Sequence, residues 1–125
     1  MRDEDFFWEG ARDGKLLVQK CRQCETLRHP PLPMCAKCQS TDWSAVECTG
    51  RGEVLGWVLS THPTRPDAEV RTVVLVQLEE GVRLISNLQD IELAAIDVGM
   101  PVEVFYQTFG ETVLPQFRPA RTIRR

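Results

Sequence analysis

Two CxxC pairs constrain this chain more than any other feature of its sequence. The pairs are Cys21/Cys24 and Cys35/Cys38, and ten residues separate them. Each pair can present two thiolates from one tight turn, and two such turns form a tetrahedral site for a metal ion. Because all four positions are cysteine, the site is closed, which indicates a structural metal rather than a catalytic one. We predict zinc. Iron in a rubredoxin-like site uses the same ligands, and a redox dithiol is the remaining alternative.

The length and hydrophobic content bound the class of protein. A chain of 125 residues is one domain of ordinary size or two very small ones, and 42% hydrophobic residues are enough for a packed core. The longest wholly apolar run, residues 73–76, is too short to span a membrane, and no apolar stretch follows the acidic N-terminus as it would in a signal peptide. We therefore expect a cytoplasmic protein, in which paired cysteines are more often metal ligands than disulfides.

The first third of the sequence predicts a short helix followed by a ribbon. Residues 3–13 are expected to form the helix, with Asp3 or Asp5 as its cap and Gly14 at its end. Three prolines within residues 30–33 exclude a helix or a central strand, so residues 28–34 form an extended loop between the cysteine pairs. Two strands complete the ribbon, at residues 16–20 and 43–48.

After a joint at residues 50–52 the pattern is β throughout. Residues 79–81 predict a tight hairpin turn with positive φ at Gly81, and residues 90–96 predict one or two helical turns with Asp90 as cap. Five strands with a helical turn between the third and fourth are the order of an OB-type barrel, and an open five-stranded sheet is the alternative. The expected strands cover residues 53–60, 71–78, 82–88, 102–108 and 112–117.

Several of these strands are apolar on both faces. In the first, simple alternation puts Val54 and Val58 on one face and Leu55, Trp57 and Leu59 on the other. A free small barrel needs only its inner face apolar. The apolar side chains on the other face must therefore be covered by the ribbon, the helix, another subunit or an apolar ligand.

The charge distribution argues against a nucleic-acid partner. Residues 49–109 carry four basic and nine acidic side chains, a net charge of −5, which repels a phosphate backbone. The strands at 71–78 and 82–88, on which an OB fold would stack bases, contain no aromatic residue. A single-stranded nucleic-acid-binding module is therefore kept as an alternative only.

No catalytic residue is predicted from the remaining candidates. Cys48 could be a nucleophile or an extra ligand, but a small apolar residue in a strand is the simpler interpretation. His29 and His62 lie in proline-containing loops, and no nucleophile elbow, zinc-protease helix or phosphate loop is present. A stand-alone small thioesterase, the second alternative, would need one of these histidines or a loop acid as its base.

An ordered set of short motifs runs through nearly the whole chain. It comprises Phe7-Trp8-Glu9-Gly10, Gly14-Lys15-Leu16-Leu17, the two CxxC pairs, Arg28-His29-Pro30-Pro31, Gly50-Arg51-Gly52-Glu53-Val54, Leu84-Ile85-Ser86-Asn87-Leu88, Gly99-Met100-Pro101-Val102-Glu103-Val104 and Leu114-Pro115-Gln116-Phe117-Arg118-Pro119. In this order the motifs resemble the acyl-CoA-associated OB-fold family with a rubredoxin-like zinc ribbon, domain of unknown function thirty-five.

The resemblance implies both a fold and a role. The fold is mainly β: an N-terminal helix (residues 1–14), a rubredoxin-like zinc ribbon (15–49) and a five-stranded OB-fold barrel with a basic C-terminal tail (50–125). The role is that of an accessory partner of thiolase-superfamily enzymes. We therefore expect a non-catalytic, zinc-binding subunit of a hetero-oligomer. It would dock on a thiolase or side-chain aldolase and support C–C bond cleavage or formation on acyl-CoA, with neither nucleic acid nor membrane as partner.

A CoA thioester would bring phosphate groups, which arginine binds best. The basic tail supplies several candidates and could equally dock on an acidic patch of the partner subunit. The arginines expected to contact CoA phosphates or the partner are Arg65, Arg71, Arg118 and Arg121, with Arg124 and Arg125 as further tail candidates.

Overall fold

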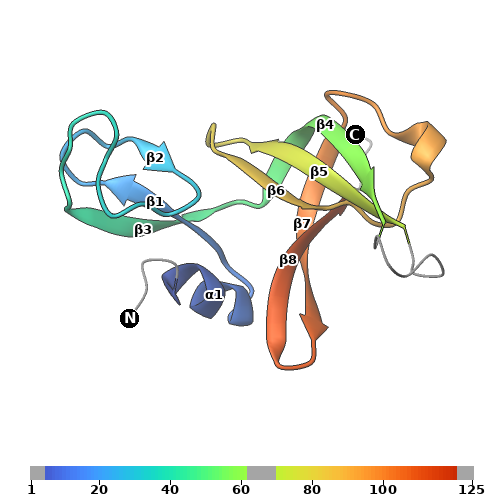
Figure 1. Cartoon of the computed structure of the whole chain (residues 1–125), viewed down its shortest axis with the longest axis horizontal. Helices are drawn as coiled ribbons and strands as arrows, with labels where there is room; N and C mark the ends of the chain where they lie inside the picture. The colour runs from blue at the N-terminus through green and yellow to red at the C-terminus, as the bar shows by residue number, and fades with distance from the viewer. Residues whose placement is uncertain (1–4, 62–69, 121–125) are drawn as a thin grey trace, which may run out of the picture.

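The computed structural model describes residues 5–61 and 70–120 of the chain. Figure 1 shows a three-stranded ribbon on one side and a five-stranded barrel on the other, with the helix α1 (Asp5–Arg12) packed beside both. The mainly β fold with one N-terminal helix, expected from the sequence, is confirmed. No helix within the described ranges is both long and apolar enough to cross a lipid bilayer.

Helix α1 ends where the sequence indicates. Gly14 has φ +73°, its N–H donates to the carbonyl of Ala11, and the N–H of Lys15 donates to the carbonyl of Gly10, which together form a Schellman cap. Asp5 in the first turn and Arg12 in the last complement the helix dipole. An added Cβ at Gly10 would lie 2.7 Å from Leu17, so the helix can approach the ribbon only with glycine here.

The ribbon consists of β1 (Leu16–Cys21), β2 (Leu27–Arg28) and β3 (Trp43–Cys48) in the order β2-β1-β3. Strands β1 and β3 are antiparallel over their full length. The two strands expected from the sequence are therefore confirmed, and the short β2 overlaps the predicted loop only at Arg28. Phe6 packs on Trp43 with ring centres 5.0 Å apart, which fastens the helix to the ribbon.

The barrel is built from strands in the order β6-β5-β4-β7-β8, with bounds β4 (Arg51–Ser60), β5 (Arg71–Leu78), β6 (Arg83–Asn87), β7 (Pro101–Phe109) and β8 (Thr112–Pro119). A parallel bridge between Leu88 and Phe117 brings the two end strands together. The barrel is thus nearly closed, and the open-sheet alternative is not what forms. Its core centres on fully buried side chains: Val54, Val74, Val76, Val102 and Phe117.

A β-bulge corrects the predicted faces of the first barrel strand. Val54 pairs with Val76, but Gly56 pairs with Leu75, so Leu55 is the extra residue. The bulge reverses the alternation, and Trp57 joins Val54 on the inner face while the Val58 side chain is 63% exposed. The prediction that Val54 and Val58 share a face was wrong because simple alternation cannot reveal a bulge.

Of the two predicted turns, the hairpin at Gly81 is confirmed, whereas the predicted cap at Asp90 is wrong. Gly81 has φ +94° and its N–H donates to the carbonyl of Leu78, as the predicted hairpin requires. Residues 90–96 contain only a single 3-10 turn, η1 (Leu93–Ala95), preceded by Glu92. Asp90 is not its cap, because it lies outside the turn with φ +62°.

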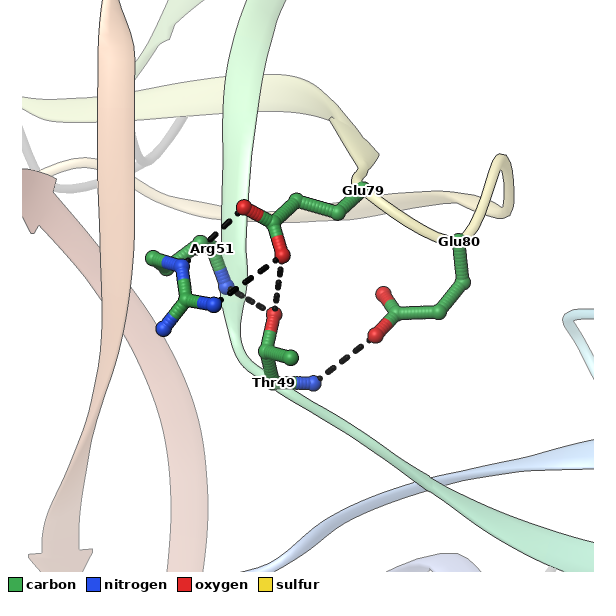
Figure 2. A network of polar contacts seen from close by, with 4 residues as sticks. All are labelled: Thr49, Arg51, Glu79 and Glu80. Atoms are coloured by element: carbon green, nitrogen blue, oxygen red, sulfur yellow. Dashed lines mark hydrogen bonds and ion pairs between the residues drawn. The ribbon is translucent and has the colours of Figure 1, made fainter.

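A polar network ties the linker between the two modules to the barrel (Figure 2). The Thr49 hydroxyl donates to Oε1 of Glu79 at 3.0 Å, and the Thr49 amide donates to Oε2 of Glu80 at 3.0 Å. Arg51 Nε donates to Oε2 of Glu79 at 3.0 Å. Both glutamates lie in the β5–β6 turn, so the segment that connects β3 to β4 is held against this barrel hairpin.

Candidate metal centre and the pocket beside it

The two cysteine pairs form matching knuckles. In each, the first cysteine's carbonyl accepts a hydrogen bond from the residue four positions on, from Glu25 to Cys21 at 2.9 Å and from Gln39 to Cys35 at 2.8 Å. Glu25 has φ +65° and Gln39 has φ +64°. These are the positions where knuckles often carry glycine, so each turn adopts the left-handed conformation at a cost of about 1–2 kcal/mol.

The four thiols converge on one point. The Sγ atoms of Cys21 and Cys38 are 3.5 Å apart, those of Cys24 and Cys35 are 3.6 Å apart, and all four lie within 4.8 Å of one another. A tetrahedral site with metal–sulfur bonds of about 2.3 Å has sulfur–sulfur edges of about 3.8 Å. Disulfide sulfurs would be about 2.05 Å apart. The residues therefore fit a single four-coordinate metal ion, and the four predicted ligands are brought together.

Hydrogen bonds to sulfur favour the thiolate form that a metal requires. The Thr26 hydroxyl lies 3.2 Å from Cys24 Sγ, and this contact, followed by the Thr26 backbone N–H, lowers the pKa of Cys24 to about 6. The backbone N–H of Cys24 is the main cause that lowers the pKa of Cys21. These donors thus favour the thiolate at Cys21 and Cys24. At Cys38 the backbone N–H of Ser40 lowers the pKa, but the neighbouring Cys21 thiol and burial outweigh it and raise the pKa to about 12, so this ligand favours the thiol.

The fifth cysteine does not belong to this group. Cys48 is buried at the end of β3, among the apolar side chains of the core. Burial, with the nearby Glu80 carboxylate, raises the pKa of Cys48 to about 12, so its thiol stays protonated at neutral pH. This placement agrees with a small apolar strand residue and not with a nucleophile.

A buried glutamine that the sequence reasoning missed organises the proline loop. Gln19 in β1 is fully buried, and its Oε1 accepts hydrogen bonds from Arg28 Nε at 2.6 Å and from the Leu32 amide at 2.7 Å. Arg28 also donates to the Leu32 carbonyl at 2.9 Å. The only sequence signal was a polar residue within an apolar strand. These bonds hold the loop so that His29 stacks on Phe7, with ring centres 5.0 Å apart.

A cavity of about 330 Å³ lies where the helix, the proline loop and the barrel meet. Strands β6 and β8 supply its barrel side through residues 84–87 and 114–116. The helix and the loop supply the remaining wall: Phe7, Trp8, His29, Pro30 and Pro31. Burial lowers the pKa of His29, so its imidazole is neutral at pH 7 and no lining residue carries a charge.

Only part of the predicted arginine set falls within the described residues. Arg118 in β8 donates from Nε to Oε2 of Glu103 at 2.9 Å, and its guanidinium carbon lies 5.1 Å from the centre of the Phe105 ring. Arg71 is exposed at the start of β5. Their contact with CoA or a partner stays a prediction. The other predicted residues lie outside the described ranges: Arg65, Arg121, Arg124, Arg125 and His62.

The architecture defines the class of the protein as a four-cysteine ribbon joined to an OB-type barrel. Two family models match the sequence: the ChsH2 rubredoxin-like zinc ribbon domain over residues 8–44 and the ChsH2 C-terminal OB-fold domain over residues 45–107. The chain belongs to this ChsH2 zinc-ribbon and OB-fold family, which includes proteins described as DUF35 scaffolds.

Curated relatives agree with this assignment. A "probable enoyl-CoA hydratase alpha subunit" of Thermomonospora curvata is 45% identical over 95% of this chain, and a "3-oxo-4,17-pregnadiene-20-carboxyl-CoA hydratase alpha subunit" of Mycobacterium tuberculosis is 36% identical over 94%. The chain spans 38% of the length of each. A "DUF35 domain-containing scaffold protein" of Pyrococcus furiosus is 31% identical over 84% of this chain and 79% of its own length.

Solved structures show the same fold. A chain of the "Ltp2-ChsH2(DUF35) aldolase" superposes with a TM-score of 0.87 and 43% identity, covering 95% of both chains. A protein of unknown function from the DUF35 family of Sulfolobus solfataricus has a TM-score of 0.66 at 15% identity, covering 93% of this chain and 84% of its own. The second likeness concerns the fold alone.

Proposed function

We propose that this chain is a zinc-stabilised, non-catalytic subunit that docks on a thiolase-like enzyme and supports C–C bond cleavage or formation on an acyl-CoA. The observation that carries the proposal is the match over 95% of both chains to one component of an Ltp2-ChsH2(DUF35) aldolase. A steroid-type acyl-CoA is the substrate class we favour, because one relative's name contains a pregnadiene carboxyl-CoA.

The chemistry of the residues supports an accessory role. Four thiolates would fill all coordination positions of a tetrahedral ion, so no position would be open at which the metal could activate water or substrate. Among the described residues, no carboxylate, cysteine or lysine lines the adjoining pocket, and none gives a hydrogen bond to Nδ1 of His29, which is a neutral imidazole there. Free thiols at a metal site also suit a reducing cytosol, where we place the protein.

The metal assignment is tested by elemental analysis of the purified chain. We expect one zinc ion per chain, and we expect Cys21→Ser/Cys38→Ser to lose it, because two of four ligands are removed. Cys48→Ala is the matched cysteine control and should retain the metal, since Cys48 lies in the core away from the cluster. Equal metal content in the double variant and the control would contradict the site.

The role is tested by co-expression with a candidate thiolase-like protein. We expect the two to co-elute in size-exclusion chromatography, and we expect retro-aldol or thiolytic cleavage of an acyl-CoA to require both. A thiolase-like protein that elutes alone and is fully active alone would overturn the proposal. Cleavage of the thioester to free CoA by this chain alone would instead support the thioesterase alternative.

A further inference from the structure

We propose that the pocket between α1, the proline loop and the β6–β8 side of the barrel binds the apolar, ring-containing acyl group of a CoA thioester. This inference rests on the proposed function, because it assigns to this chain a part in holding the substrate. It concerns a surface distinct from the cysteine cluster, since no cysteine lines the pocket.

The pocket lies where the barrel wall is least sealed. Strand β6 pairs with β5 and β8 pairs with β7, whereas β6 and β8 are joined by few described contacts. Among them are the Leu88–Phe117 bridge, with a hydrogen bond from the Gln89 amide to the Phe117 carbonyl at 2.8 Å, and a hydrogen bond from Ser86 Oγ to the Pro115 carbonyl at 2.8 Å. The seam between the two strands is therefore lined by side chains rather than closed by a regular hydrogen-bond ladder.

The lining chemistry selects an uncharged, apolar occupant. The volume of about 330 Å³ falls within the range of about 300–1,000 Å³ found for small-molecule sites. Ile85, whose side chain is 70% exposed, lines this pocket together with the half-buried Leu114. An apolar side chain that is so exposed costs free energy, which a ligand that covers it would recover.

The rigid parts of the wall favour rings over a flexible chain. Phe7, Trp8, Pro30 and Pro31 present flat or cyclic groups with few rotatable bonds. A fused-ring acyl group likewise has little conformational freedom, so binding orders few bonds on either side, whereas a linear acyl chain loses its rotamers. The mainly apolar lining also contains a few polar side chains, which allows recognition of one hydroxyl or keto substituent. They are His29, Ser86, Asn87 and Gln116.

The test is calorimetric titration of the full metal-loaded chain with three probes: a steroid carboxylic acid CoA thioester, octanoyl-CoA and free CoA. We expect the steroid thioester to bind at least about tenfold more tightly than octanoyl-CoA, which corresponds to about 1.4 kcal/mol, and free CoA not to bind. Quenching of tryptophan fluorescence should accompany binding, because Trp8 lines the pocket. Equal binding of all three probes would overturn the inference, since the CoA phosphates would then be what the chain recognises.

A matched pair of variants locates the site. Ile85→Asp places a charge in the pocket lining, and Val58→Asp makes the same kind of change at a strand residue, 63% exposed, that does not line the pocket. We expect Ile85→Asp to weaken the steroid thioester by about tenfold or more and Val58→Asp to leave it unchanged, because only the first puts a carboxylate against the acyl group. Circular dichroism would verify that both variants fold.

The outcomes separate this inference from the proposed function. If Ile85→Asp binds the thioester as well as the parent chain, or if no thioester binds, the pocket assignment is wrong. If no thioester binds but Ile85→Asp prevents co-elution with the thiolase-like protein, the pocket is a partner contact, and only the docking proposal survives. If the thioester binds at Ile85 and no partner co-elutes, the inference stands and the docking proposal fails.

Discussion

Gly50, in the joint between the ribbon and the barrel, offers the sharpest quantitative test of the structure. It has φ +86°, and an added Cβ would overlap Cγ1 of Val104. In Gly50→Ala the left-handed backbone costs about 1–2 kcal/mol and the overpacking about 1–3 kcal/mol, while the reduced freedom of the unfolded chain returns about 0.4–1 kcal/mol. We therefore expect the free energy of unfolding to fall by about 1–4.6 kcal/mol, measured by urea denaturation of the metal-loaded chain.

Two controls divide this penalty into its parts. Gly81→Ala has a similar backbone, φ +94°, but no atom within 4 Å of the added Cβ, so only the backbone cost of about 1 kcal/mol should remain. In a Val104→Ala background the overlapping methyl is gone, so Gly50→Ala should cost about as much as Gly81→Ala. Equal losses at both glycines in the parent chain would refute the claimed contact with Val104.

Four further changes have defined outcomes. Glu25→Gly should stabilise the chain by about 0.5–1 kcal/mol by relieving φ +65°, whereas Lys37→Gly in the other knuckle should not, as chemical denaturation would show. Burial lowers the folded-state pKa of His29, so the unfolded state binds this proton more readily. The free energy of unfolding should therefore fall from pH 7 to pH 5, and His29→Phe should flatten this part of its pH dependence. Glu79→Gln should barely move the thermal midpoint, because the Arg51 pair is exposed. Excess chelator should unfold the ribbon, since structural zinc contributes about 10–16 kcal/mol in comparable small sites, and unchanged near-ultraviolet circular dichroism would contradict this.

The features that sequence could predict are those encoded locally. The cysteine spacing predicted the knuckles, and the positive φ at Glu25 and Gln39 is what those turns need even without glycine. Apolar runs bounded by glycine and proline gave the barrel strands within a few residues, and the strand order gave the barrel type. Gly81 marked its hairpin because glycine adopts positive φ without the steric cost that a Cβ would bring.

The features that sequence could not predict depend on tertiary packing. The bulge at Leu55 leaves no trace in the apolar pattern, because valine, leucine and tryptophan suit either face. Gln19 looked like an ordinary strand residue, and its function depends on an arginine and an amide brought near it by the folded loop. The pocket could not be predicted at all, since its walls come from segments as far apart as Phe7 and Gln116.

The separation of those walls along the chain has a consequence for how the protein is made. Helix α1 is synthesised well before β8, yet both border the same hollow. A nascent chain can close its knuckles around an ion long before residues 114–116 have been synthesised. The hollow is therefore complete only once β8 has been synthesised, and a product that ends between the knuckles and β8 would keep the metal ligands but lack one wall of the hollow.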